Sequence, residues 1–178
     1  MPVSRYLYLL CLPGIGGGLY LWLMDANSLA PWTNILVGVA LLFWALIRFW
    51  SPSQKLLAAL LERYLPAYHL VMGVVHGLTN LGGALLAILA SSRNSEKEAI
   101  RYTVAHYYLA FSTIQMLLLA IIKGQYDILI SNFPAAMIAA MVYLFIGNRI
   151  FTRSSNQFYI VALNLFIAAY GIIVLLKL

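Results

Sequence analysis

The sequence predicts an all-α integral membrane protein with about five transmembrane helices and one broken, re-entrant helical hairpin. Hydrophobic residues make up 63% of the 178 residues, charged residues only 9%, and the mean hydropathy is +0.90. A soluble globular domain carries about 25% charged residues, so this composition excludes a soluble fold. A further observation is that apolar segments follow one another along the chain with only short polar connections between them.

Five uninterrupted apolar segments each come close to the ~20 residues that cross the hydrocarbon layer as a helix. They cover residues 6–24, 34–50, 100–123, 129–151 and 157–176. The first follows Arg5 as in a signal peptide, but no small-x-small cleavage site comes after it, so we expect a retained helix. We predict a turn at residues 25–32 and a single transmembrane domain over residues 1–178.

The first helix carries a glycine-rich run, Leu-Pro-Gly-Ile-Gly-Gly-Gly, at residues 12–18. Gly14 and Gly18 are four residues apart, a spacing that lets two membrane helices pack closely. The glycines could instead mark an unwound ligand loop. We favour close packing, because no polar side chain accompanies them.

Two capping boxes predict helix starts between the spans. The first, with proline at the first helical position, opens a short amphipathic helix over residues 51–65, which we expect to lie on the membrane surface. The second, at residues 95–98, opens the helix that runs on to Lys123.

The remaining apolar segment, residues 66–92, contains residues that a simple membrane helix avoids. Residues 73–84 read Gly-Val-Val-His-Gly-Leu-Thr-Asn-Leu-Gly-Gly-Ala. Each of the four glycines lowers helix propensity by about 1 kcal/mol relative to alanine, and His76, Thr79 and Asn80 add polar groups. In lipid, non-helical backbone is tolerated only where protein buries it or where it lines a wet cavity. The stretch therefore predicts a break between two half-helices, as in transporter substrate sites.

The basic residues bear on whether this broken segment crosses the membrane. If it crosses, the two sides carry six and five basic residues, which is no bias. If it dips in and returns, one side carries nine: Arg5, Arg48, Lys55, Arg63, Arg93, Lys97, Arg101, Arg149 and Arg153. Only Lys123 and Lys177 then lie on the other side. The positive-inside rule favours the second arrangement, with the N-terminus cytoplasmic and the C-terminus outside.

The motif Gly73-x-x-x-Gly77-Leu78-Thr79-x-x-Gly82-Gly83 resembles the glycine-rich signature that opens the second repeat of the TauE/SafE sulfite exporter family, the TSUP membrane permeases. The likeness continues through Arg101-Tyr102-Thr103, through Pro134 in the penultimate helix and to Gly171 in the last helix. Two features depart from the family pattern. Leu81-Gly82-Gly83-Ala84 lacks the family's preceding glycine and its proline, and most of a first repeat is missing.

On this resemblance the chain is a short or N-terminally truncated member. Residues 1–50 correspond to the last two helices of a first repeat, and residues 66–178 to a second repeat that begins with a re-entrant segment. The resemblance implies a multi-pass permease of the cell inner (plasma) membrane. It would transport small sulfur-containing anions (sulfite, organosulfonates), coupled to the proton gradient.

The candidate substrate-binding residues are His76, Gly77, Thr79, Asn80, Gly82, Gly83 and Gln115. Half-helix N-termini expose unpaired N–H groups and about half a positive charge, which suits an anion without a buried Lys or Arg. Thr79 and Asn80 would add donors, or only cap the half-helices. His76 would carry a proton in a coupled cycle, or stay neutral and hydrogen-bonded across the hairpin.

The helix after the hairpin carries two polar stripes. Thr103, His106 and Thr113 share one, and Tyr108, Ser112 and Gln115 share the other. Gln115 lies near mid-bilayer, where an unpaired amide costs several kcal/mol. Its amide must therefore face a partner helix or a ligand, and both readings remain open.

We expect neither an enzyme nor a cofactor or metal site. No acidic residue lies inside a predicted span, and the sequence shows no metal-spaced His/Cys cluster and no nucleophile motif. The expected partners are the lipid bilayer and a small anionic sulfur compound, and we expect no nucleic acid, because the basic residues form no stripe. The alternative is a non-transporting remnant or subunit whose site another chain completes, for example in a homo-oligomer.

Overall fold

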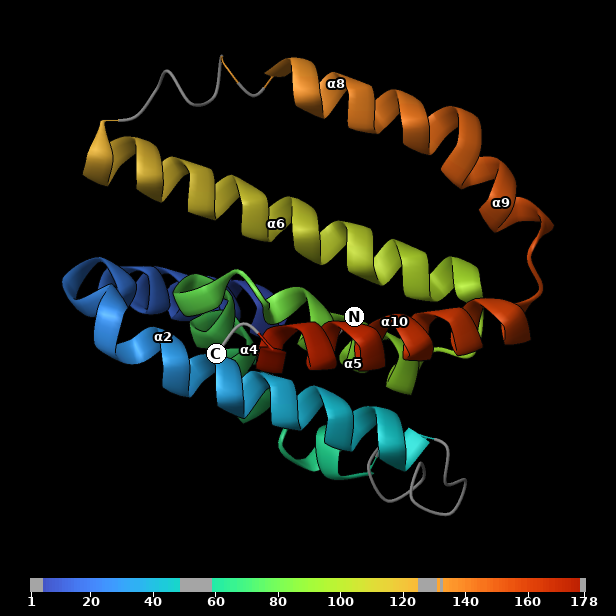
Figure 1. Ribbon diagram of the computed structural model, residues 1–178, viewed down its shortest axis with the longest axis horizontal. Coiled ribbons are helices and arrows are strands. Elements are labelled where there is room, and N and C mark those ends of the chain that lie inside the picture. Colours follow the sequence, from blue (N-terminus) through green and yellow to red (C-terminus); the bar gives the residue numbers. More distant parts are fainter. Residues whose placement is uncertain (1–4, 49–58, 125–130, 132, 177–178) are drawn as a thin grey trace.

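The computed structural model describes residues 5–48, 59–124, 131 and 133–176, and every regular element in these ranges is helical (Figure 1). Four helical stretches in them are long and apolar enough to cross a membrane: Leu7–Met24, Lys97–Ile122, Phe133–Arg153 and Asn156–Leu176. They indicate a multi-pass membrane protein. The predicted second span, residues 34–50, ends outside the described residues, as does most of the predicted surface helix, of which residues 59–63 are helical.

The first helical segment differs from the prediction in two ways. It opens with a π-helical turn, η1 (Leu7–Cys11), and continues without interruption as α2 (Leu12–Arg48). The predicted turn at residues 25–32 is wrong, because the backbone there stays helical. In Figure 1, α2 bends at its left-hand end and returns, so a bend within a helix takes the place of a loop. Pro31 lies in this stretch, and an interior proline kinks a helix where it does not end it.

The first arm of α2 packs against α4 (Leu65–Thr79) through backbone rather than side chains. A Cβ atom at Gly14 would lie 3.0 Å from the carbonyl oxygen of Leu70, and a Cβ at Gly18, Gly73 or Gly77 would collide with the backbone of the facing helix. Gly14 faces Leu70 and Gly18 faces Val74, so residue numbers rise in the same direction along both helices, which therefore run parallel. The predicted close packing at Gly14 and Gly18 is confirmed.

Two clusters of buried side chains complete the core. One joins η1 and α2 to α4, α5 (Gly82–Arg93) and α6 (Lys97–Lys123) around Met72, Tyr107 and Phe111. The other joins the second arm of α2 to α5 and to α10 (Asn156–Leu176) around Leu41, Ile88 and Ile167. Together they enclose the α4–α5 pair.

The start of α6 is held by contacts with the α9–α10 connection, not by the predicted capping box. The N-cap is Glu96, which makes no side-chain cap, and the N–H of Lys97 donates to Oδ1 of Asn156 at 3.3 Å. The Lys97 ammonium donates to the carbonyl oxygens of Phe151 at 2.8 Å and Ser154 at 2.6 Å. A cation among the last carbonyls of a helix also offsets the negative end of its dipole.

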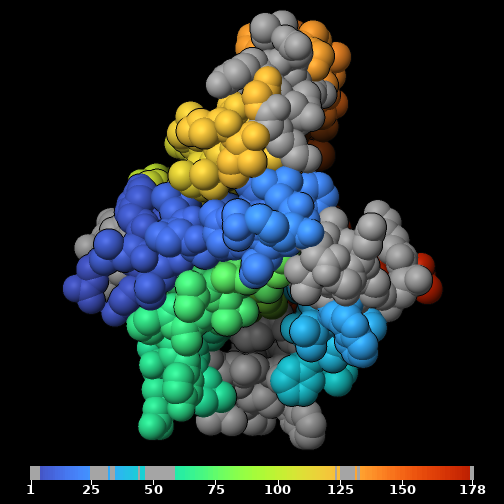
Figure 2. Space-filling model, turned by 90° about the vertical axis from the view of Figure 1, so that its left-hand side faces the viewer, coloured from blue at the N-terminus to red at the C-terminus, as the bar shows by residue number. Residues whose placement is uncertain are grey.

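The penultimate span consists of α8 (Phe133–Val142), the π-helical turn η2 (Tyr143–Gly147) and α9 (Asn148–Arg153). Pro134 is helical, and Ser131 before it is helical as well, so Pro134 lies within the penultimate helix as predicted. No residue of α8 is buried. In Figure 2, the end of α6 and α8 (yellow to orange) project beyond α2 and α4 (blue and green).

We expect Gly77→Ala to lower the free energy of unfolding by about 1–3 kcal/mol, the usual cost of overpacking. The added methyl group meets the backbone of α2, which cannot turn aside. Denaturation by sodium dodecyl sulfate in mixed micelles measures the change. Gly17→Ala is the matched control, because a Cβ there meets nothing within 4 Å. Equal losses in the two variants would contradict this account of the contact.

Candidate functional site

The broken segment is a pair of short helices joined at a single left-handed residue. Helix α4 ends at Thr79, Asn80 has φ 58° and ψ 14°, and α5 begins at Gly82. Asparagine is one of the few non-glycine residues that adopt this conformation readily. The backbone N–H of Asn80 donates to the carbonyl oxygen of His76 at 2.8 Å, which closes the last turn of α4. The predicted break is therefore confirmed.

The two helices turn back on each other as a hairpin. Nη2 of Arg93, at the end of α5, lies 2.5 Å from Oε1 of Glu62, just before α4. The Tyr68 hydroxyl of α4 also donates to the carbonyl oxygen of Leu85 in α5 at 2.8 Å. With 15 and 12 residues, neither helix reaches the ~20 residues of a full span.

Thr79 and Asn80 form the cap between the half-helices. The Thr79 hydroxyl donates to the carbonyl oxygen of Val75 at 2.7 Å and accepts the N–H of Leu81 at 3.1 Å. These contacts agree with the interpretation that Thr79 caps the half-helices. The Asn80 side chain is exposed.

His76 and Gly82 lie against each other on the inner side of the hairpin. A Cβ at Gly82 would collide with Cβ of His76, so only glycine lets α5 start here. The imidazole is 2% exposed, and its centroid is 4.6 Å from that of the Phe111 ring. The Gln115 side chain of α6 lies near the imidazole. Nδ1 of the ring is buried and has no hydrogen-bond partner among the described residues.

Tyr108 covers the start of α5, which the sequence reading did not anticipate. Its hydroxyl stands where a Cβ of Gly83 would be. Tyr170 of α10 lies in the neighbourhood of Tyr108. The sequence places Tyr108 on the same helix stripe as Gln115. That shared face is the feature from which a role for Tyr108 at the site could have been predicted. Nothing in the sequence singled out Tyr170.

The structure thus brings His76, Gly82, Gly83 and Gln115 together at the start of α5. No side chain caps this helix at Leu81, the residue before it. Gly77 lies elsewhere, since its Cα faces the backbone of α2 at Ile15 and Leu19. The arrangement can offer N–H and amide donors to a small ligand at a helix N-terminus.

A second buried histidine has a structural role. His69 is fully buried, its Nδ1 lies 2.8 Å from the carbonyl oxygen of Leu65, and its Nε2 lies 2.7 Å from the Tyr107 hydroxyl. A neutral ring must donate from Nδ1 to the carbonyl, so Nε2 accepts the hydroxyl proton of Tyr107. Both nitrogens are thereby satisfied, and the contact ties α4 to α6.

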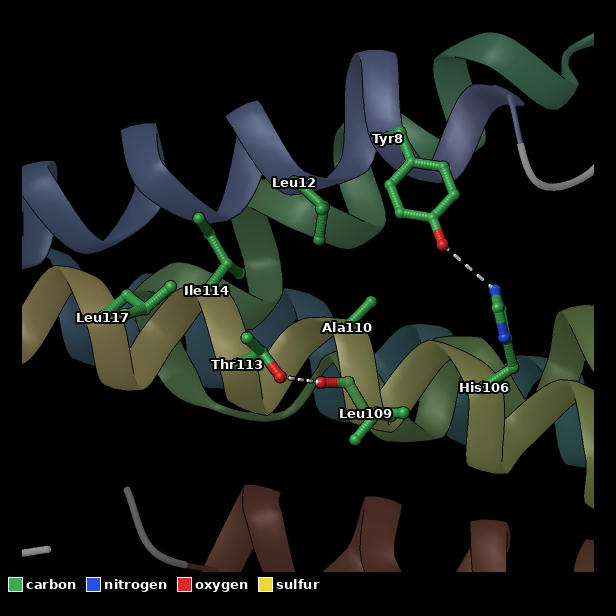
Figure 3. Close-up of a pocket in the computed structure, with 8 residues that line it drawn as sticks. All are labelled: Tyr8, Leu12, His106, Leu109, Ala110, Thr113, Ile114 and Leu117. Carbon is green, nitrogen blue, oxygen red and sulfur yellow. Dashed lines mark hydrogen bonds between the residues drawn. The ribbon is translucent and has the colours of Figure 1, made fainter.

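A cavity of about 290 Å³ lies between η1–α2 and α6, away from the hairpin (Figure 3). None of the predicted site residues lines it. Within the described ranges, no group of three or more His, Cys, Asp and Glu side chains is placed to hold a metal ion.

Comparisons of the chain with protein families, with curated proteins and with solved structures found no match. The resemblance noted in the sequence therefore stays a prediction. The chemistry of the hairpin carries the functional argument.

We expect Thr79→Val to destabilise the protein by about 1–2 kcal/mol, the usual cost of losing a capping side chain. The change leaves the N–H of Leu81 without the oxygen that now accepts it. Thr79→Ser keeps that oxygen and should restore most of the loss. Thermal unfolding in detergent measures both variants, and a serine variant as unstable as the valine variant would contradict the capping role.

Proposed function

We propose that this chain is a permease-like membrane protein that binds a small anion at the break between α4 and α5. One observation carries the proposal. The helix start formed by Gly82 and Gly83, to which the N-cap residue Leu81 adds no side-chain cap, lies directly against a buried imidazole whose Nδ1 has no partner in the described structure.

The charges and donors at this point favour an anion over a cation. The N-terminus of a helix carries about half a positive charge, and its first N–H groups lack partners within the helix. Glycine at both leading positions lets a ligand approach this backbone closely. The Gln115 amide and the Tyr108 hydroxyl supply further donors from α6.

The hairpin geometry supports a re-entrant segment. Since Glu62 pairs with Arg93, the chain enters and leaves the hairpin at the same end of the helix bundle. The contacts of Lys97 with the end of α9 and of Arg101 with Asn148 place further basic residues at that end. By the positive-inside rule this end faces the cytoplasm, with the N-terminus on the same side in an inner (plasma) membrane.

Sulfite and small organosulfonates are the substrates that the sequence resemblance implies. They are compact anions whose oxygens accept hydrogen bonds from the donors at this site. His76 is the titratable side chain inside the break, so it would carry the proton of a coupled cycle.

Access to the site requires a movement of α6 or of the Tyr108 side chain. In this conformation the phenol covers Gly83, and an anion reaches the N–H groups of α5 only when the phenol moves away. Rocking of α6 and α10 relative to the hairpin would open the site to one side of the membrane, as in transporters built around broken helices.

The second candidate is a subunit whose site another chain completes. This candidate is favoured by the exposure of α8, which has no buried residue. Its span contacts α6 at the other end, in η2 and α9. There, Arg101 donates to Oδ1 of Asn148 at 3.1 Å and to the Tyr143 hydroxyl at 3.2 Å. A partner chain would pack along the apolar length that α8 leaves exposed.

We expect calorimetry on the detergent-purified protein to detect binding of sulfite or methanesulfonate, and Gly83→Ala to weaken it at least tenfold, about 1.4 kcal/mol. The alanine Cβ would occupy the approach to the α5 backbone and displace the Tyr108 hydroxyl. Gly17→Ala is the control, because its Cβ meets nothing within 4 Å.

Gln115→Leu provides a second variant with a side chain of similar size, should Gly83→Ala fail to fold. It removes the amide beside His76, so binding should weaken while the thermal midpoint stays close to that of the parent. The anion site is disproved if the folded parent binds neither compound, or if both variants bind as the parent does. Binding only by a purified oligomer would favour the subunit reading.

A further inference from the structure

The cavity between η1–α2 and α6 is a groove with room for a small molecule. Its volume is about 290 Å³, close to the lower end of the range of small-molecule sites, about 300–1,000 Å³. A cavity of about 150 Å³ is enough to hold benzene, so this groove can take one ring with a short side chain. Figure 3 shows Ala110 in the middle of the lining residues, where its small side chain leaves this space open.

The groove opens to the side of the bundle. Leu109 and Leu117, which line it, are 69% and 53% exposed. Both belong to the apolar stretch Lys97–Ile122 of α6, which is long enough to cross a membrane. In a membrane the opening therefore faces lipid, and a ligand would enter the groove from the bilayer.

Hydrogen-bonding capacity is concentrated at one end of the groove. There the Tyr8 hydroxyl lies 3.4 Å from Nε2 of His106, longer than the usual 2.7–3.2 Å. The Tyr102 ring stacks on this imidazole with 6.2 Å between the centroids. The Thr113 hydroxyl already donates to the carbonyl oxygen of Leu109 at 2.7 Å. The loose pair of Tyr8 and His106 is thus what the lining offers to a polar group of a ligand.

This pair suits a hydroxyl group. If Nε2 of His106 carries the proton, the imidazole donates to the Tyr8 oxygen, and the Tyr8 hydroxyl is free to donate to a ligand. In the other tautomer Tyr8 donates to Nε2, and its oxygen is free to accept. A ligand hydroxyl both donates and accepts, so it fits either case, whereas a carbonyl oxygen fits only the first.

The walls of the groove favour an uncharged ligand. None of the 8 lining residues in Figure 3 is Lys, Arg, Asp or Glu. A charged group would lose its hydration against these walls without gaining an ion partner, which is costly. A bare hydrocarbon would fill the apolar part but leave the Tyr8 and His106 pair without a third partner.

We propose that this groove binds a small uncharged molecule from the membrane that carries one hydroxyl group on a compact apolar body, as an alkylphenol does. The hydroxyl group lies at Tyr8 and His106, and the apolar body lies against Ala110 and Ile114. Tyr8 belongs to the π-helical turn η1, and π-helical turns are frequent at functional sites. The groove shares no residue with the hairpin site, so the proposal does not depend on transport.

The test is photolabelling of the full chain in phosphatidylcholine vesicles with an alkylphenol that carries a diazirine on its alkyl chain. Labelled peptides are mapped by mass spectrometry, and we expect the label within residues 8–12 and 106–117. Unlabelled 4-propylphenol should displace the probe at a membrane concentration about fivefold lower than propylbenzene, the hydrocarbon of similar shape. This ratio corresponds to one net hydrogen bond.

Tyr8→Phe removes the hydroxyl and keeps the ring. It should abolish the advantage of propylphenol over propylbenzene while propylbenzene displaces the probe as it does in the parent. Tyr20→Phe is the matched control, because Tyr20 is an exposed tyrosine of α2 that does not line the groove. It should keep the full advantage.

Ala110→Trp fills the groove and should abolish the labelling. Ala105→Trp, at an exposed position of the same helix outside the lining, should be labelled as the parent is. Equal displacement by propylphenol and propylbenzene in the parent would overturn the proposal, because the groove would then accept any hydrocarbon, including an acyl chain. So would a label that maps outside the groove, an advantage that persists in Tyr8→Phe, or full labelling of a folded Ala110→Trp variant.

Discussion

The backbone contact between the first arm of α2 and α4 determines where the rest of the molecule can lie. Lipid tails are as apolar as leucine, so membrane helices associate through close packing rather than through a hydrophobic drive between them. Gly14 and Gly18 on one helix and Gly73 and Gly77 on the other let the two backbones meet. Once α4 is fixed in this way, Asn80 sets the direction of the turn, and α5 must pack against His76 and α6. The start of α5, with its two glycines, is thereby held inside the bundle.

Helix α6 separates two chemically different regions. Tyr108, Phe111 and Gln115 face the hairpin, where the backbone N–H groups of α5 and the imidazole of His76 offer hydrogen bonds in a buried setting. His106, Leu109 and Leu117 line the groove toward η1 and α2. One helix thus presents hydrogen-bonding side chains on its inner face and an apolar groove on another. A movement of α6 that uncovers Gly83 would also alter the groove, because the helix carries both sets of side chains.

The sequence predicted the parts of the structure that depend on local residue types. Composition predicted a membrane protein, the glycine spacing predicted close helix packing at Gly14 and Gly18, and the polar residues among glycines predicted a break within residues 73–84. It failed at residues 25–32, because Asp25, Asn27 and Pro31 are typical of a turn, yet the backbone stays helical and bends there. It also failed where a distant contact decides the outcome. Ser95 is a favourable capping residue, yet Asn156, 59 residues after Lys97 in the chain, meets the first turn of α6 instead. Tyr108 lies over Gly83 only because α6 packs on α5, which no local pattern encodes.

The central claim is that the α4–α5 hairpin enters the membrane and returns to the side from which it came. Cysteine accessibility tests it most directly, in a Cys11→Ser background, with a membrane-impermeant maleimide applied to intact cells and to inverted vesicles. Single cysteines replace Arg63, before the hairpin, and Ser95, after it, and Ser131 serves as the reference for the opposite side; all three positions are exposed. The account predicts that positions 63 and 95 react from the same side, the cytoplasmic one, and that position 131 reacts from the other. Labelling of positions 63 and 95 from opposite sides would show a helix pair that crosses the membrane, and would contradict the account.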